Sequence, residues 1–265
     1  MKQGINLRPV IAIAVICVGL ALLWEGVKLV FGVSDVKLPH LTTIAEGFIS
    51  PARRNGPPMY QILFNAALVT LRGAITGFVV GGLLGFFLGV VFAHSALLER
   101  SLVPYMVASQ TVPILAIAPM VVIWLRNPNL SVAVIAAYLT FFPVAVNTLR
   151  GLKSPDPRAL ELMRSYAANK WQTLWKLRFP AALPFIFTAL KISATASIVG
   201  AIVGELPSGA QDGLGRAILN FNQYYATGPE RLWATIIATA AVGIVFFVLV
   251  SLAERWALRN IVRTA

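Results

Sequence analysis

The sequence predicts an all-α polytopic membrane protein with six transmembrane helices, and composition and segment length support this. Of its 265 residues, 58% are hydrophobic and only 12% are charged, against roughly 25% charged residues in a soluble domain. Six apolar segments approach or exceed the ~20 residues that cross a bilayer core of about 30 Å. They are residues 9–31, 65–93, 102–125, 130–149, 182–204 and 232–253. No soluble domain fits between them, so we expect one transmembrane domain over residues 1–265.

The first apolar segment follows Lys2 and Arg8 and superficially resembles a signal peptide. It is longer than the 7–15 residues of a signal h-region, and no clear small-residue cleavage site follows it. We therefore expect a retained transmembrane helix.

The distribution of charge predicts the orientation of the chain. The gap 150–181 is strongly basic, whereas the gaps on the opposite side are nearly neutral. Basic residues also flank the first and last spans, where Arg255, Arg259 and Arg263 outnumber Glu254. By the positive-inside rule, both termini and residues 150–181 are cytoplasmic. Cytoplasmic loops facing anionic lipid also account for the net charge of +12 without a nucleic-acid partner.

The second span carries glycine at every fourth position. These glycines are Gly73, Gly77, Gly81, Gly85 and Gly89, with Gly82 beside them. Residues four apart lie on one helix face, so the pattern predicts a groove in which another backbone approaches closely. We interpret it as a packing surface inside a helical bundle.

Prolines are expected to interrupt two later spans. Pro113 and Pro119 fall in the third span and Pro143 in the fourth. Each frees a backbone carbonyl that protein, water or substrate must satisfy, and broken helices often border a pathway. We therefore predict a pathway lined by Pro113, Pro119 and the hydroxyls of Ser193, Thr195 and Ser197, although these hydroxyls can equally join helices.

Few ionisable groups lie in or beside the spans. Arg72 and Glu205 fall on the same side of the membrane, where they can form an outer ion pair or remain separately solvated. Lys191 lies about two turns inside its span, where its stem can reach lipid phosphates. His40, His94 and the single cysteine, Cys17, have no metal-ligand spacing and form no disulfide framework.

The basic segment DPRALELMRSYAANKWQTLWKLRFPAALP, residues 156–184, retains helical spacing. Asp156 followed by Pro157 predicts a helix start. Leu160, Met163 and Ala167 then form an apolar stripe, with Leu162 and Tyr166 beside it. This helix can lie in the lipid interface or enter a groove on a soluble partner, whereas the tryptophan-rich part after it favours the interface.

The same segment resembles the EAA loop of the permease subunits of ATP-binding-cassette (ABC) importers. Glu161, a small residue at Ala167, Leu177 and the pair Phe179-Pro180 have the spacing of that loop. Several identities differ, and Ala167 replaces a glycine although alanine resists positive φ. The stretches LPHLTTIAEGF, QTVPILAIAPMVVIWL and LKISATASIVGAIVGE are similar to the permease subfamily for nitrate, sulfonates, taurine and thiamine precursors.

The resemblance implies a type I importer fold in a bacterial inner membrane. Residues 157–167 would be the coupling helix within the loop 153–181, contacting a cytoplasmic ATP-binding subunit through Arg158, Glu161, Met163, Arg164 and Ala167. A second permease copy and a periplasmic or lipid-anchored substrate-binding protein would complete the transporter. The aromatic residues Phe221, Tyr224 and Tyr225 can contact that binding protein, cap the cavity or anchor at the interface.

The sequence has no GxxxxGK[ST] motif and no nucleophile and base pair. We therefore expect no enzymatic activity, cofactor or metal in this chain, with ATP and Mg²⁺ bound by the partner subunit. An alternative is an autonomous secondary transporter that uses Arg72 and Glu205 as an ion relay. Since no arginine cluster lines a span, an organic solute is slightly favoured over an anion.

Overall fold

The structure, a computed structural model, describes residues 8–52, 56–210 and 212–262. Lys2 and Arg263, which the charge argument used, lie outside this range. Regular structure in the described part is helical, apart from an isolated bridge between Pro51 and Pro58. The helices are α1 (Arg8–Val30), α2 (Leu41–Ile49), α3 (Met59–His94), α4 (Ala96–Ser109), α5 (Ile114–Leu125), α6 (Pro128–Leu152), α7 (Pro157–Ser165), α8 (Lys170–Thr173), η1 (Leu174–Arg178), α9 (Phe179–Glu205), α10 (Leu214–Gln223), η2 (Tyr225–Thr227) and α11 (Pro229–Val262).

The helices confirm a polytopic all-α chain. Within the described residues, five helices are long and apolar enough to cross a membrane, and the bent pair α4 and α5 makes a sixth when counted as one span. That pair corresponds to the predicted third span. The helix that contains the predicted fifth span begins earlier than that span, because α8, η1 and α9 run on as one helical stretch, Lys170–Glu205.

The chain divides into two compact units. The first contains the residues up to Leu63 together with Ile218–Ile237, and the second contains Phe64–Ala217 together with the residues from Ala238 onward. The boundaries fall inside α3, α10 and α11.

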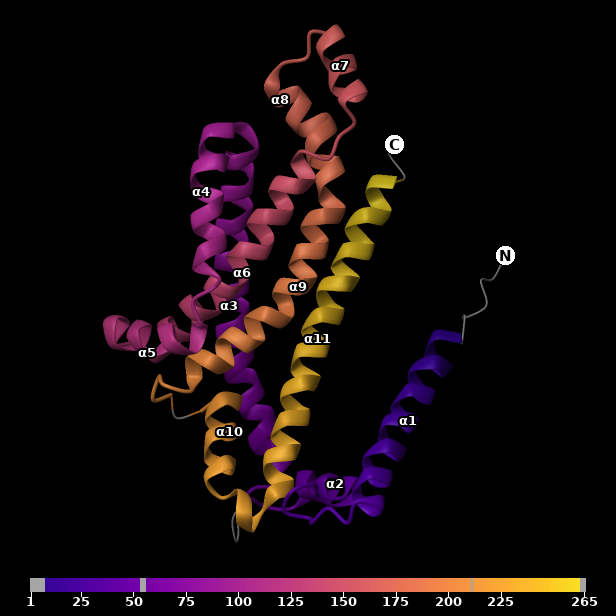
Figure 1. Ribbon diagram of the computed structural model, residues 1–265, viewed down its shortest axis with the longest axis vertical. Helices are drawn as coiled ribbons and strands as arrows, with labels where there is room; N and C mark the ends of the chain where they lie inside the picture. Colours follow the sequence, from indigo (N-terminus) through magenta and orange to yellow (C-terminus); the bar gives the residue numbers. More distant parts are fainter. Residues whose placement is uncertain (1–7, 53–55, 211, 263–265) are drawn as a thin grey trace. The chain divides into compact units, whose positions relative to one another are not determined.

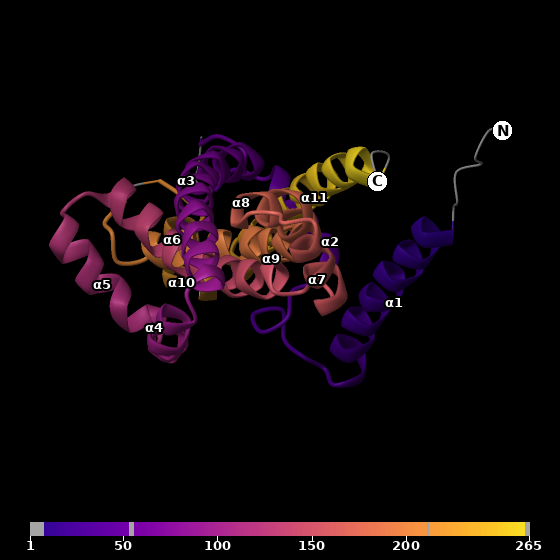
Figure 2. The ribbon, with the colours of Figure 1, turned by 90° about the horizontal axis from the view of Figure 1, so that it is seen from above.

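The core of the second unit is the contact between α3, α6 and α9, with α11 against it. Alanine and branched aliphatic side chains from all four helices form a buried cluster: Ala74, Val132, Ala136, Ala194, Ile198, Ala201 and Phe246. Figure 2 shows α6 and α9 in the middle of this unit and α4 and α5 at its edge.

The glycines of α3 allow its backbone to contact α6. A Cβ at Gly81 would lie 2.4 Å from the carbonyl oxygen of Ala137, and one at Gly85 would lie 2.3 Å from that of Phe141. Gly82 faces elsewhere, because the nearest atom to its Cβ position belongs to Leu190 at 3.9 Å. The every-fourth-residue glycine pattern therefore marks a packing face, as the sequence predicted.

The proline-rich third span is bent by 95° between α4 and α5. The bend precedes Pro113, whose fixed φ begins α5 and whose missing N–H cannot continue α4. The Tyr138 hydroxyl of α6 donates to the Ser109 carbonyl at the bend. Pro119 and Pro143 lie inside α5 and α6 without ending them, so the expected interruption occurs only at Pro113.

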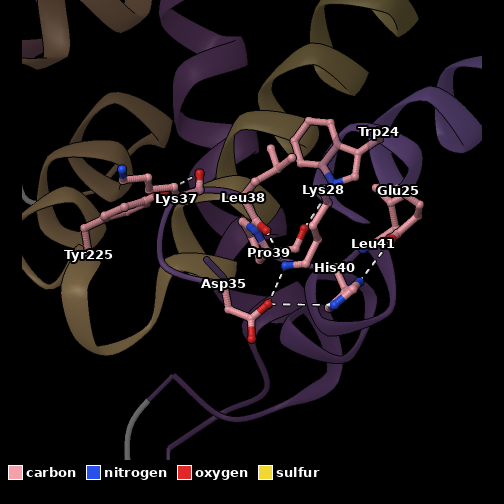
Figure 3. A network of polar contacts seen from close by, with 10 residues as sticks. All are labelled: Trp24, Glu25, Lys28, Asp35, Lys37, Leu38, Pro39, His40, Leu41 and Tyr225. Atoms are coloured by element: carbon pink, nitrogen blue, oxygen red, sulfur yellow. Dashed lines mark hydrogen bonds and ion pairs between the residues drawn. The ribbon is translucent and has the colours of Figure 1, made fainter. Parts of the chain in front are cut away.

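In the first unit, a polar network joins the end of α1 to the start of α2 (Figure 3). Lys28 is buried and its ammonium donates to Asp35 and, at 2.5 Å, to the Leu38 carbonyl. The hydrogen bond from Lys28 holds the pKa of Asp35 below its usual value. Glu25 accepts the Leu41 N–H at 2.9 Å and contacts the His40 Nδ1 at 2.7 Å.

Aromatic residues complete the first unit. Trp24 donates to the Pro39 carbonyl at 3.0 Å and its ring meets that of Trp233 edge-on, with centroids 4.9 Å apart. The Tyr225 hydroxyl accepts from Trp233 Nε1 at 3.2 Å and donates to the Lys37 carbonyl at 3.4 Å. Tyr225 therefore has a role inside the chain, whereas Tyr224 is exposed.

Candidate functional site

The predicted coupling segment forms a short helix beyond the ends of α6 and α9 (Figure 1). Asp156 caps α7 by accepting the Arg158 N–H at 2.8 Å, and Pro157 occupies the first helical position, as the sequence predicted. The segment is held at its base by an ion pair between Lys153 and Glu99 of α4. Leu152 and Leu174 are buried there against Ala182 and Ile186.

A Schellman motif ends α7. The Ala168 N–H donates to the Met163 carbonyl and the Ala167 N–H to the Arg164 carbonyl, both at 2.9 Å. Ala167 has φ +52°, in the left-handed region that disfavours an L-residue with a side chain. The sharp turn therefore forms although alanine replaces the glycine of the EAA loop.

The turn leads into α8 and a π-helical turn. Asn169 and Gln172 form a capping box at the start of α8. In η1 the helix carries one extra residue per turn, and the Phe179 N–H donates to the Leu174 carbonyl five residues earlier. This turn lies directly before Pro180, which has no N–H to donate.

The two faces of α7 differ from the simplest expectation. Leu160 and Met163 of the predicted stripe are half-buried against their own chain. The neighbouring residues Leu162 and Tyr166 are exposed, with relative accessibilities of 57% and 77%. These two residues, four apart on one face, are the apolar surface that α7 leaves open.

The predicted coupling residues differ in exposure: four of the five are exposed, and Met163 is half-buried. Arg158, Glu161 and Arg164 are exposed, as is Ala167 in the turn. Arg164 also lines a basic cavity against the end of α3. The coupling role of these residues remains a prediction.

Arg72 and Glu205 lie at the opposite end of the second unit and line one open cavity of about 860 Å³. No ion pair joins them in the structure. Glu205 is buried and its Oε2 accepts the Gly215 N–H at 2.7 Å, while the Leu214 N–H donates to the Thr70 hydroxyl at 2.8 Å. Glu205 and Thr70 thus satisfy the first N–H groups of α10.

Gly213 makes this cap possible. Its φ is +126°, and a Cβ there would lie 2.6 Å from the Glu205 carboxyl group. The turn before α10 therefore fits against the carboxylate only with glycine at this position. Sequence reasoning placed Glu205 at the correct end of its span but not in contact with α10, since the fold of the intervening turn decides that contact.

The predicted pathway residues do not share one environment. Ser193 and Ser197 are fully buried in α9. The Ser193 hydroxyl donates across to the Thr140 carbonyl of α6 at 3.3 Å, and that of Ser197 donates to Ala194 within its own helix. Thr195 is exposed, as is Pro113 at the bend of the third span. Their role in a pathway remains a prediction.

Sequence reasoning missed one ion pair between two spans. Lys191 of α9 contacts Glu254 of α11 at 2.7 Å, and both side chains are largely buried. Lys191 therefore has a protein partner, and the expected reach toward lipid phosphates is not what the structure shows. Glu254 falls just beyond the predicted last span, so its partner in another helix was not evident.

Two solved structures that superimpose on this chain come from ABC transporters. The chain superimposes on an amino acid ABC transporter crystallised with histidines with a TM-score of 0.61 and 20% identity, covering 74% of this chain and 94% of that chain. It superimposes on the inward-facing MetNI methionine ABC transporter with a TM-score of 0.53 and 18% identity, covering 76% and 95%. The fold is that of type I importer permeases.

Known sequences give closer similarity. The riboflavin transport system permease protein RibX of Chloroflexus aurantiacus is 29% identical over 95% of this chain and 90% of its own. The formylaminopyrimidine transport permease protein ThiX of Halalkalibacterium halodurans is 36% identical over 58% and 62%. A putative aliphatic sulfonates permease, SsuC of Bacillus subtilis, is 32% identical over 73% and 69%.

A family model covers residues 62–259, the greater part of the chain, from the first turn of α3 through α9 and into α11. Together with the coupling-segment spacing and the apolar helices, this match establishes the family. The chain belongs to the binding-protein-dependent transport system inner membrane components, the multi-pass permease subunits of ABC importers.

Proposed function

We propose that two copies of this permease form a translocation pathway and that α7 couples it to ATP hydrolysis by a separate cytoplasmic subunit. The observation that carries the proposal is the open face of α7. It is a capped helix outside the membrane spans whose Leu162 and Tyr166 side chains are exposed. An amphipathic helix with exposed anchors four residues apart fits a hydrophobic groove on a partner.

The rigid ends of α7 suit a mechanical role. Asp156 fixes its start, the Schellman motif fixes its end, and the Lys153–Glu99 pair holds its base. A displacement of α7 would therefore pass into α6 and α9. Under this proposal residues 150–181 and both termini are cytoplasmic, in agreement with the charge asymmetry.

The proposal is tested by purifying the tagged full chain from its native membranes. We expect an ABC-type ATPase subunit, identified by mass spectrometry and by ATP hydrolysis in the eluate, to co-purify. Replacing both Leu162 and Tyr166 by alanine should lower its recovery at least tenfold, because truncating interface anchors typically costs more than 1 kcal/mol each.

The matched control is Lys176→Ala, which removes an exposed side chain from η1 outside α7. It should leave recovery unchanged. If the double variant retains the ATPase subunit and ATP-dependent uptake, α7 is not the coupling helix.

For the substrate, we infer a small organic solute delivered by a binding protein. The relatives RibX and ThiX are named for riboflavin and formylaminopyrimidine, both nitrogen-containing ring compounds. Uptake into proteoliposomes containing the assembled transporter should therefore be competed by ring compounds of this kind more strongly than by an aliphatic sulfonate. The opposite order would assign the chain to sulfonate transport.

An autonomous secondary transporter has less support. It requires Arg72 and Glu205 to act as an ion relay, but Glu205 caps α10 and forms no ion pair with Arg72. Uptake without an ATPase subunit would favour this alternative.

A further inference from the structure

A second cavity, of about 490 Å³, lies between the end of α3 and the α7–η1 segment. Three cationic side chains from three elements line it: Arg164 of α7, Lys170 of α8 and Arg178 of η1. His94, at the end of α3, adds an imidazole whose Nδ1–H donates to the Val90 carbonyl at 2.8 Å. The other lining residues are Ala93, Leu160, Ala168 and Thr173.

The cations of this cavity form no ion pair among the described residues. No carboxylate lines the cavity, and none of Arg164, Lys170 and Arg178 forms an ion pair or side-chain hydrogen bond among the described residues. Lys153 and Lys191 show the contrast, since each has a carboxylate partner. Three cations held around one cavity without an anion repel one another, and an anionic ligand would remove that repulsion.

The cavity lies where membrane spans end. His94 is the last residue of α3, and Lys170 is the first residue of the helical stretch Lys170–Glu205, which contains the fifth span. Trp171 and Trp175, on the same short segment, are exposed, with relative accessibilities of 69% and 57%. Exposed tryptophans at the end of a span are typical of the headgroup level of a bilayer.

We propose that this cavity binds the phosphate headgroup of an anionic phospholipid. Basic pockets between membrane helices are a recognised form of headgroup site. The arginines can hold phosphate oxygens through two N–H groups each, and Lys170 adds a point charge. Ala93, Leu160 and Ala168 provide an apolar wall for the glycerol end of the lipid. The lipid then ties the α7–η1 segment to the end of α3.

A membrane lipid fits better than soluble phosphate or a protein. The volume exceeds that of a single phosphate, and the position is at the ends of spans rather than on the exposed face of α7. The site shares Arg164 with the predicted coupling residues, but neither Leu162 nor Tyr166 of the open face lines it, so this inference goes beyond the coupling proposal and can fail separately from it.

The test is native mass spectrometry of the full chain, purified in detergent, stripped of lipid and titrated with phosphatidylglycerol, phosphatidylcholine or inorganic phosphate. Wild type should bind phosphatidylglycerol more tightly than phosphatidylcholine. Lys170→Gln with Arg178→Gln should weaken phosphatidylglycerol binding on the order of 30-fold, taking each cation as roughly equal in effect. Arg164 is left intact because of its predicted coupling role.

The control is Lys176→Gln, which removes one charge from the same segment outside the cavity and so matches the single variant Lys170→Gln. It should leave lipid binding within about twofold of wild type. If the double variant does not fold, Lys170→Gln alone should give a smaller loss and Arg178→Lys should retain most binding, since it keeps the charge.

Three results would overturn the proposal. The first is that Lys176→Gln and the double variant lose affinity for phosphatidylglycerol equally, or that neither loses any, since the cavity would then confer no selectivity. The second is displacement of phosphatidylglycerol by inorganic phosphate with equal affinity, which would assign a soluble ligand. The third is a double variant that binds phosphatidylglycerol as tightly as wild type but recovers less of the ATPase subunit on co-purification. That result would assign the cavity to the protein partner.

Discussion

The α3–α6–α9 core and the α7–η1 segment belong to one compact unit, but they differ in how far their side chains find partners within the chain. In the core, glycines bring backbones together and the buried hydroxyls of Ser193 and Thr140 donate to carbonyl groups. In the α7–η1 segment, Leu162 and Tyr166 are exposed, and the three cations of the basic cavity form no ion pair with any residue that the structure describes. Groups with partners inside the chain hold the core together. The exposed apolar groups and the cations without an ion pair lie where we expect the chain to bind another molecule.

The largest effect is expected from Gly85→Ala in the core. A Cβ at this position would lie 2.3 Å from the Phe141 carbonyl oxygen, so α3 and α6 must separate. Overpacking of this kind costs about 3 kcal/mol of the free energy of unfolding. Thermal unfolding in detergent, followed by tryptophan fluorescence, measures the loss.

Gly82→Ala is the matched control, because its nearest neighbour, Leu190, is 3.9 Å from the Cβ position. It should be neutral or slightly stabilising, since alanine is the better helix former. Equal destabilisation by both variants would mean that the glycine face is not what holds α3 against α6.

A smaller effect is expected at the edge of the core, from Glu205→Ala. This variant leaves the buried Gly215 N–H without its acceptor, which costs about 2 kcal/mol. Arg72→Ala should change stability by less than about 0.5 kcal/mol, because no ion pair connects Arg72 to Glu205.

A double-mutant cycle separates the two interpretations of Glu205. Thr70→Val and Glu205→Ala should be coupled, since both residues cap α10, whereas Arg72→Ala and Glu205→Ala should be additive. Coupling to Arg72 instead would restore the ion-pair hypothesis.

The smallest effect is expected in the α7–η1 segment, from Ala167→Gly. Glycine adopts φ +52° without the steric cost that alanine incurs. The free energy of local unfolding of this turn should therefore rise by about 1 kcal/mol. Amide hydrogen exchange at Met163–Ala168 should slow. The adjacent change Ala168→Gly should speed exchange or leave it unchanged, and equal slowing in both variants would contradict the strained-turn interpretation.

Much of the fold followed from local sequence patterns. Apolar segments placed the spans, the four-residue glycine repeat identified the packing face of α3, and Asp156-Pro157 marked the start of α7. These features depend on periodicity or on neighbouring residues. Helix ends were less well predicted, because apolar stretches report membrane depth and not helicity: α11 continues past residue 253 through the polar Glu254 and Arg255.

The remaining contacts depend on which distant residues the fold brings together. Lys191 and Glu254 lie in different helices, and neither sequence neighbourhood specifies the other. For the same reason the sequence left the surroundings of Glu205 open, between a pair with Arg72 and separate solvation, whereas in the structure it accepts the Gly215 N–H of α10. The open face of α7 is made by Leu162 and Tyr166 and not by the predicted stripe, because Leu160 and Met163 of that stripe are half-buried against the chain itself.

The π turn at Leu174–Arg178 determines how α8 is rotated about the helix axis relative to α9 within the stretch Lys170–Glu205. One residue turns an α-helix by about 100°. Deleting one residue of η1 would therefore rotate the faces of α8 by roughly that angle relative to α9. Lys170 would leave the basic cavity and Trp171 would change direction, while the composition and hydropathy of the stretch would hardly alter. A single inserted residue thus determines which side of this helix is basic and which is aromatic.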